Sequence, residues 1–201
     1  AALKMLEGNR EERIQGLRIF CEYRDQRSFP LLLPLLDQPC PVERMSAVYA
    51  LGRNPCPSAV QKLVSLLETD DNAYVRRATA WSLANYDNQI VLKPLINALK
   101  NDVAAVRLWS SSSLAEIGNV SSKNAELAAE QLLISLKIDN ESGVRSNCIW
   151  SLCRLFEKLD NTFQECFVDE CTKIALFDKE PSVMEEAKTA LDSMGMQGFY
   201  N

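Results

Sequence analysis

A nine-residue helical pattern recurs six times along this chain of 201 residues, and no other feature restricts the possible folds as strongly. The six segments align without gaps as ERIQGLRIF (12–20), ERMSAVYAL (43–51), VRRATAWSL (75–83), VRLWSSSSL (106–114), VRSNCIWSL (144–152) and VMEEAKTAL (183–191). Their second positions are separated by 31, 32, 31, 38 and 39 residues. Self-similarity at such a period is the signature of stacked repeats, in which each repeat contacts its neighbours.

A second set of segments, between the aligned ones, also carries apolar residues at helical spacing. These segments cover residues 58–68, 89–100, 124–137 and 161–177. Each pair of helices forms a hairpin whose apolar seam is buried only by stacking on the next hairpin. The pattern predicts an all-α fold, a right-handed α-α superhelix (solenoid) of about six short repeats, with the aligned helices lining its concave side. We expect a single array over residues 1–201, with repeats beginning near residues 1, 29, 58, 89, 124 and 161.

An arginine and an aspartate recur in phase with the repeat. The second position of the aligned segment is arginine in five segments: Arg13, Arg44, Arg76, Arg107 and Arg145. Five to seven residues before the second position lies an aspartate: Asp37, Asp70 or Asp71, Asp102, Asp139 and Asp178. Each arginine is able to reach an aspartate or a carbonyl of its own or the neighbouring repeat. We interpret the series as a structural ladder that fixes stacking geometry, because isolated surface ion pairs stabilise little.

Glycine follows three of the aligned segments near the expected helix end, at Gly52, Gly118 and Gly195. Helices often end with a residue in the left-handed αL conformation, which glycine adopts most easily. We therefore predict an αL cap at each of the three positions.

Three segments show most clearly a helix, a turn aspartate and a Val-Arg pair in succession: YVRRATAWSL (74–83), KPLINAL (93–99) and AAVRLWSSSSLAEIG (104–118). This pattern resembles the HEAT family, and the resemblance covers nearly the whole chain. A period near 31 is shorter than the usual HEAT length. It is similar to the HEAT-like repeat of the cyanobacterial phycobilisome-lyase group, which contains bilin lyases and HEAT scaffolds.

That resemblance implies several activities. Some members of the group attach bilins to, or detach them from, cysteines of phycobiliproteins, and some help phycobilisome turnover. Others are scaffolds, including one that interacts with A-type iron–sulfur assembly proteins. Deoxyhypusine hydroxylase, another short-repeat HEAT relative, binds iron through His-Glu motifs. This chain contains no histidine, which excludes that last activity.

Composition argues against nucleic-acid and membrane partners. The net charge is -5, and the lysines and arginines form no stripe of the kind that nucleic-acid binders show. No apolar run approaches the roughly 18 residues of a membrane span. The seven cysteines include no CxxC pair, which favours reduced thiols in a cytosol-like compartment, a cyanobacterial cytosol or a plastid stroma. The first residue is alanine, so we expect a processed or trimmed chain whose targeting segment is not visible.

Few residues suit catalysis or metal binding. Without histidine, Ser-His and Cys-His nucleophile pairs and His-based zinc or iron sites cannot form. Two pairs of cysteines lie five residues apart, Cys148 with Cys153 and Cys166 with Cys171. Five helical residues turn the side chain by about 140°, so neither pair converges on one metal. We predict no catalytic residue and no metal site. A bilin is left open as a cofactor, and an iron–sulfur cluster is disfavoured, although the sequence leaves a cluster of cysteines from different repeats open. Cys40 and Cys56, each between two prolines, are the expected exposed thiols, and most others are expected in the core.

An aromatic and apolar stripe is predicted on the inner wall of the array. With the first residue of each segment counted as zero, position six holds Tyr49, Trp81 and Trp150, where the HEAT resemblance implies a polar residue facing the concave surface. Position two adds further residues to the same face, and arginines edge it. The expected binding residues are Arg18, Met45, Tyr49, Arg77, Trp81, Leu108, Trp150 and Arg154. Such a stripe suits a partner helix, or a planar tetrapyrrole whose propionates meet arginine. Alternatively the rings wedge between repeats as extra core, which is the role expected of Trp109.

The primary functional hypothesis is a non-enzymatic scaffold or chaperone of the phycobilisome-lyase-like HEAT group. Its partner would be a phycobiliprotein, another photosynthetic or assembly protein, or a second HEAT-repeat subunit. One alternative is a bilin lyase subunit that holds phycocyanobilin on the concave face, and another is an iron–sulfur assembly partner protein. Neither nucleic acid nor membrane insertion is expected.

Overall fold

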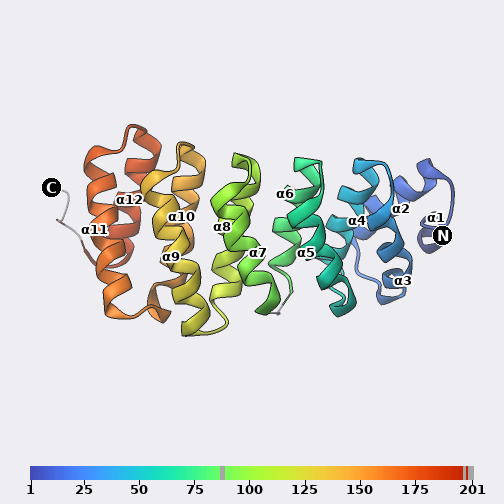
Figure 1. The fold of residues 1–201 in the computed structure, drawn as a ribbon, viewed down its shortest axis with the longest axis horizontal. Coiled ribbons are helices and arrows are strands. Elements are labelled where there is room, and N and C mark those ends of the chain that lie inside the picture. The colour runs from blue at the N-terminus through green and yellow to red at the C-terminus, as the bar shows by residue number, and fades with distance from the viewer. Residues whose placement is uncertain (87–88, 197, 199–201) are drawn as a thin grey trace. The chain divides into compact units, whose positions relative to one another are not determined.

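The computed structural model describes residues 1–86, 89–196 and 198, and every regular element in these ranges is a helix (Figure 1). The predicted all-α fold is therefore confirmed. The chain divides into two compact units, an N-terminal unit of Ala1–Pro94 and a C-terminal unit of Leu95–Asn201. Their boundary falls within α7 (Leu92–Asn101). A single array over residues 1–201 stays a prediction.

The N-terminal unit stacks three helices that correspond to the first three aligned segments. They are α2 (Arg10–Glu22), α4 (Pro41–Arg53) and α6 (Ala73–Leu83), and α4 packs between the other two. The remaining helices of this unit are α1 (Ala2–Met5), α3 (Phe29–Leu32) and α5 (Val60–Thr69), with 3₁₀ turns at η1 (Gln26–Ser28), η2 (Leu33–Asp37), η3 (Pro57–Ala59) and η4 (Gln89–Val91). Asn9 begins α2 with a capping box: its side chain accepts a hydrogen bond from the Glu12 N–H, and the Glu12 carboxylate accepts one from the Asn9 N–H.

The helix that precedes α4 is short for a chemical reason. Proline has no N–H, so Pro34 cannot make the bond to the carbonyl four residues earlier that an α-helix requires. The chain accordingly changes from α-helix at Leu32 to the 3₁₀ turn η2. Leu32 and Leu36 are nevertheless fully buried, so this interrupted segment still supplies the outer layer of its repeat.

The C-terminal unit repeats the hairpin with longer helices. They are α8 (Ala104–Gly118), α9 (Ser122–Ile138), α10 (Ser142–Leu155), α11 (Asn161–Phe177) and α12 (Pro181–Ser193), with the 3₁₀ turn η5 (Phe156–Lys158) after α10. Helix α10 is central, since it packs on α8, α9 and α12 (Figure 1). Helices α9 and α11, which lead into α10 and α12, each span 17 residues, and this length accounts for the longer spacing of the last two segments.

The core follows the aligned positions. Position zero is a buried valine in four segments, and position eight is a buried leucine in five. These residues are Val75, Val106, Val144 and Val183, and Leu51, Leu83, Leu114, Leu152 and Leu191, all at most 1% exposed. Burial of a leucine side chain contributes roughly 1.5–3 kcal/mol, so one repeated pair of positions supplies much of the hydrophobic stabilisation.

Only one of the three predicted αL caps forms. Gly195 has φ of 75°, and the Met196 N–H donates to the Leu191 carbonyl at 2.9 Å, as in a Schellman motif. The predictions at Gly52 and Gly118 are wrong, because both residues lie within α-helices. Gly52 instead permits a close approach: a Cβ at this position would lie 2.5 Å from Trp81 Cζ3.

Candidate functional site

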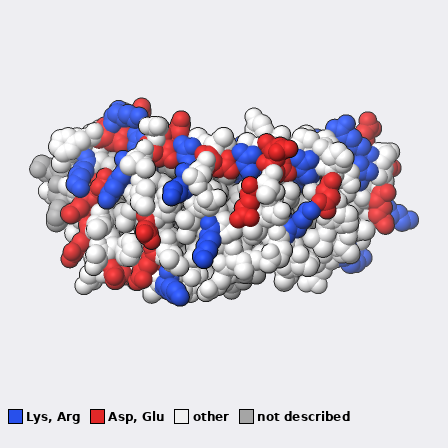
Figure 2. Space-filling view, in the orientation of Figure 1, with Lys and Arg blue, Asp and Glu red and all other residues white. Residues whose placement is uncertain are grey.

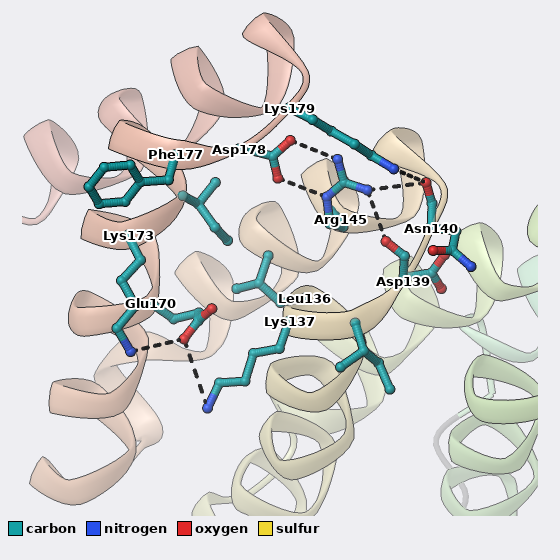
Figure 3. A pocket seen from close by; sticks show the side chains of 12 residues that line it. Leu136, Lys137, Asp139, Asn140, Arg145, Glu170, Lys173, Phe177, Asp178 and Lys179 are labelled. Carbon is teal, nitrogen blue, oxygen red and sulfur yellow. Dashed lines mark hydrogen bonds and ion pairs between the residues drawn. The ribbon is translucent and has the colours of Figure 1, made fainter.

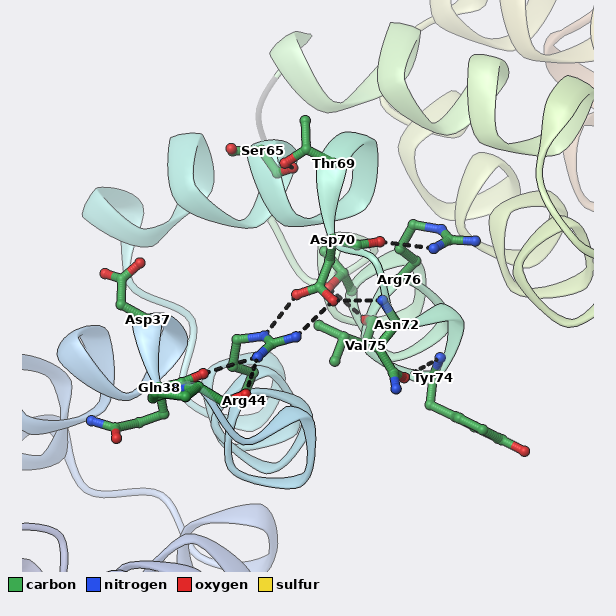
Figure 4. A network of polar contacts seen from close by, with 12 residues as sticks. Asp37, Gln38, Arg44, Ser65, Thr69, Asp70, Asn72, Tyr74, Val75 and Arg76 are labelled. Carbon is green, nitrogen blue, oxygen red and sulfur yellow. Dashed lines mark hydrogen bonds and ion pairs between the residues drawn. The ribbon is translucent and has the colours of Figure 1, made fainter.

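The in-phase arginines connect neighbouring repeats. Arg44 donates from Nε and Nη2 to both oxygens of Asp70, at 2.8 and 2.9 Å, and from Nη1 to the carbonyls of Gln38 and Pro39 (Figure 4). Its carboxylate partner thus comes from the next repeat and its carbonyl partners from its own. Such bidentate pairs are stronger and more directional than single ion pairs. Asp70 also accepts from the Asn72 N–H at 2.9 Å and so fixes the turn before α6.

The same arrangement recurs in the C-terminal unit. Arg107 makes a bidentate pair with Asp139 at 2.7 Å for both bonds, and donates to the Asp102 carbonyl at 2.8 Å. Arg145 pairs with Asp178 at 2.9 and 2.7 Å and donates to the Asp139 carbonyl at 2.9 Å. One guanidinium therefore ties the turn of its own repeat to the turn of the next.

Three details of the predicted ladder differ in the structure. Arg13 pairs with Glu43, at 2.8 Å from Nε, rather than with an aspartate. Asp37 meets Lys62 and not an aligned arginine, because η2 ends the helix early and leaves its side chain exposed. Asp70 and not Asp71 meets Arg44, since the Asp71 side chain points to solvent. Arg76 donates to the Asp70 carbonyl at 2.8 Å.

The paired carboxylates predict how stability depends on pH. Burial alone would raise the pKa of Asp178, but hydrogen bonds from Arg145 and from the Glu180 N–H outweigh it and hold the pKa below its usual value. The pKa values of Asp70 and Asp139 are lowered in the same way, by hydrogen bonds that outweigh burial. A carboxyl whose folded-state pKa is lowered contributes stability above its unfolded value, about 3.9, and loses it as the pH falls further.

We expect the free energy of unfolding to be nearly constant from about pH 7 to 5 and to fall steeply below about pH 4. Urea unfolding followed by circular dichroism at each pH measures it. The matched variant Asp178→Asn removes one of these titrating groups and is expected to show a shallower decline. An identical slope in wild type and variant would contradict the assignment.

A cluster of three side chains, which we call the Tyr49–Trp81 cluster, joins α4 to α6. The ring centroids of Tyr49 and Trp81 are 5.3 Å apart with the planes tilted by 54°, and Arg53 lies 5.7 Å from the Trp81 ring centroid. Tyr49 and Trp81 are half-buried, and Arg53 is exposed. The rings therefore contact one another and still reach solvent, with a cation over one of them.

A small hollow lies beside this cluster in the N-terminal unit. Met45 and Arg77 line it together with Pro41, Val42, Asn72 and Tyr74, and its volume is about 170 Å³. The Arg77 guanidinium lies 5.3 Å from the Tyr74 ring centroid. The hollow therefore offers mainly apolar walls, with one cationic side chain among them.

The remaining predicted binding residues are distributed between the two units. In the C-terminal unit, Arg154 lies 5.1 Å from the Trp150 ring centroid and pairs with Glu116 at 2.9 Å. Leu108 packs against the start of α10, where a Cβ at Gly143 would lie 3.4 Å from its Cδ1. Arg18 is exposed on α2 in the N-terminal unit. The predicted binding residues thus belong to both units, five of them to the N-terminal unit and three to the C-terminal unit.

Sequence reasoning missed or misplaced several side chains. Trp109 is 37% exposed, so its predicted place in the core is wrong. Arg53 and Tyr74 were not predicted, although Arg53 follows Tyr49 by four residues, a spacing that places two side chains on one helical face. The exposed ends of α9 and α11, Ile138 and Phe177, were also missed, and each is signalled by an apolar residue directly before a turn aspartate.

The cysteines differ in accessibility from the prediction. Cys56 is buried, because the Tyr86 hydroxyl reaches over its loop to the Leu51 carbonyl at 3.1 Å. Burial raises the pKa of Tyr86 to about 12. Cys40 is half-buried with Arg10 Nη2 at 3.2 Å from its sulfur, and Cys166 is exposed. Within residues 1–86, 89–196 and 198, no three cysteine or carboxylate side chains gather in a way that could hold a metal ion.

Two general surface properties bear on partners. Figure 2 shows lysines and arginines interspersed with aspartates and glutamates on the face drawn, with no continuous basic stripe there. None of the helices in the described part of the chain has the length and apolarity needed to cross a membrane.

Comparisons with known proteins concern the fold. A family model described as HEAT repeats matches residues 1–84 and 60–153, more than half of the chain. No curated protein matches the chain. Among solved structures, a designed armadillo repeat protein in complex with the peptide (KR)4 is similar, with 18% identity, a TM-score of 0.68 and 100% and 98% of the two chains covered. A chain in the complex of CpcE and CpcF of phycocyanin lyase from Nostoc sp. PCC7120 has 21% identity and a TM-score of 0.66, with 83% and 99% covered. Human deoxyhypusine hydroxylase has 16% identity and a TM-score of 0.52, with 96% and 81% covered.

Proposed function

Because this chain belongs to the HEAT repeat family, we propose that it is a non-enzymatic scaffold that holds a protein partner on the surface of its aligned helices. The observation that carries the proposal is the Tyr49–Trp81 cluster, two half-buried rings in contact with an exposed arginine over one of them. The α-α solenoid fold is shared with designed armadillo repeat proteins, one of which is in complex with a peptide.

Tryptophan, tyrosine and arginine are the residues that contribute most often to binding energy at protein interfaces. Here all three types meet at one place, between α4 and α6. Because the two rings already support one another, a partner that covers them pays little conformational entropy to order them. The adjoining hollow of about 170 Å³ has room for one apolar side chain of that partner.

The partner that we propose is a phycobiliprotein, or another photosynthetic or assembly protein of a cyanobacterial cytosol or plastid stroma. Two observations support this choice. The short period resembles the phycobilisome-lyase group, and a chain of the phycocyanin lyase complex of CpcE and CpcF has a similar fold. A second HEAT-repeat subunit would be a further partner, as the pairing of CpcE with CpcF suggests.

We expect Trp81→Ala to weaken the binding of purified phycocyanin about thirtyfold or more, since a central aromatic truncation costs about 2 kcal/mol or more. Biolayer interferometry with the immobilised full chain measures this. Val120→Ala, which shortens an exposed apolar side chain of the C-terminal unit, is the control and should leave phycocyanin binding unchanged. Equal affinity of wild type and Trp81→Ala would overturn the site, and no binding by wild type would overturn the choice of phycocyanin.

A bilin lyase subunit is the second candidate. It is favoured by the arginine that lies over the Trp81 ring, because a planar tetrapyrrole would stack on the indole and place its propionates near Arg53 and Arg77. Titration with phycocyanobilin separates the two candidates. An absorbance shift with fluorescence that Trp81→Ala abolishes would favour the lyase subunit, and an unchanged spectrum would count against it.

A further inference from the structure

Two adjoining hollows lie in the C-terminal unit where α7, α9 and α11 end. The first, between the ends of α9 and α11, has a volume of about 420 Å³, and the second, between the ends of α7 and α9, has about 400 Å³. Both are lined by Ile138, Asp139 and Asn140, so the end of α9 forms the wall that separates them. This surface belongs to helix ends and turns, and it does not include the aromatic residues of the aligned helices.

Large apolar side chains surround these hollows and remain in water. Ile138 is 71% exposed and Phe177 is 80% exposed, and they are the last residues of α9 and α11. Ile134, one turn earlier in α9, is 43% exposed and lines the second hollow. Single exposed apolar residues are ordinary, but several around one concavity mark an interaction site.

The lining of the two hollows has a positive net charge, whereas the C-terminal unit as a whole has a negative one. The C-terminal unit has sixteen acidic and ten basic side chains. The lining of the two hollows has six basic side chains and four acidic ones. A basic concavity on an acidic unit favours an acidic ligand, because the surrounding carboxylates repel such a ligand elsewhere on the unit.

The excess positive charge lies on lysines. Arg107 and Arg145 are each held by a bidentate aspartate, so they contribute little free charge. Glu170 alone lies between Lys137 and Lys173, at 3.9 and 3.5 Å (Figure 3). The lining also includes Lys100 of α7, and Lys179, whose Nζ lies 3.4 Å from the Asn140 carbonyl oxygen.

We propose that these two hollows bind an acidic amphipathic segment of a partner protein. Apolar side chains of the segment enter the hollows on either side of Ile138 and cover Phe177, and its carboxylates pair with the lysines at the rim. This surface is independent of the Tyr49–Trp81 cluster, so the full chain has two places for partners. Its occupant is recognised by acidity together with apolar spacing, whereas the aromatic cluster recognises its occupant by ring contacts.

The test uses the full chain and a fluorescein-labelled synthetic peptide with leucines three and four residues apart and glutamates elsewhere, a helical spacing. Fluorescence anisotropy is expected to show saturable binding that weakens at high salt, because the carboxylate–lysine pairs are exposed. Ile138→Ser should weaken binding about tenfold, and Phe177→Ser similarly. Both residues are exposed helix ends, so the variants should unfold at the same urea concentration as wild type.

The controls separate the alternatives. Trp81→Ala should bind the peptide as wild type does, which distinguishes this surface from the proposed phycobiliprotein site. A peptide with lysine in place of glutamate should bind at least tenfold more weakly. Equal affinity for the two peptides, or unchanged affinity in both serine variants, would overturn the proposal. A concentration-dependent dimer that Ile138→Ser dissociates, with no peptide binding by wild type, would assign the surface to a second copy and overturn it as well.

Discussion

Replacing Arg145 with alanine is expected to lower the free energy of unfolding of the C-terminal unit by about 3–5 kcal/mol, because one partner of a buried ion pair is removed. The Arg145 side chain is 5% exposed and that of Asp178 is 7% exposed. The substitution would leave a buried carboxylate without its cation, and the Asp139 carbonyl would lose a donor at 2.9 Å. Urea unfolding of the full chain, followed by circular dichroism, measures the loss.

The matched control is Arg154→Ala in the same helix. Arg154 also pairs with a carboxylate, Glu116, at 2.9 Å, but the two side chains are 42% and 45% exposed. Exposed pairs contribute about 0–1 kcal/mol, so this control should cost less than Arg145→Ala. A double variant, Arg145→Met with Asp178→Leu, should recover part of the stability, because no charge is then left buried. Equal losses in the two single variants would show that the ladder does not depend on burial.

The helices and the ladder were largely predictable because they depend on local chemistry. Five of the six aligned segments carry arginine at the second position, so this arginine has the same place in each of those repeats and is long enough to reach the next turn. The identity of its partner was harder to predict. Asp70 and Asp71 are adjacent, and only the turn geometry before Asn72 decides that the first faces Arg44 and the second faces solvent.

The aromatic site was predictable in part. Tyr49 and Trp81 occupy the same position in successive repeats, so neighbouring helices place them side by side, at 5.3 Å. Contacts that join distant segments were not predictable in this way. Cys56 follows a proline in a loop, and this position predicts an exposed thiol. In the structure Tyr86, 30 residues later, covers it. Trp109 lies at a position that is small or polar in other repeats, and the structure leaves it partly in solvent rather than in the core.

Substituting Gly52 with alanine is expected to displace the Trp81 ring and to remove the Tyr49–Trp81 contact. An added Cβ would lie 2.5 Å from Trp81 Cζ3 and 3.1 Å from Ser82 Oγ, and the first distance is too short for two carbons that are not bonded to each other. The ring has solvent on one side and can move, whereas the helix backbone cannot. Overpacking of this kind costs about 1–3 kcal/mol, which exceeds the gain of up to about 1 kcal/mol from replacing a helical glycine.

The measurements are urea unfolding and near-ultraviolet circular dichroism, which reports the environment of Trp81 and Tyr49. Gly143→Ala is the matched control, because a Cβ there meets only Leu108 Cδ1 at an ordinary 3.4 Å and its stability should not fall. Gly52→Ala should also weaken phycocyanin binding about as much as Trp81→Ala does if that protein occupies the cluster, because either change removes the supported ring pair. If Gly52→Ala keeps the wild-type aromatic spectrum and stability, the close approach of α4 and α6 does not hold the indole in place.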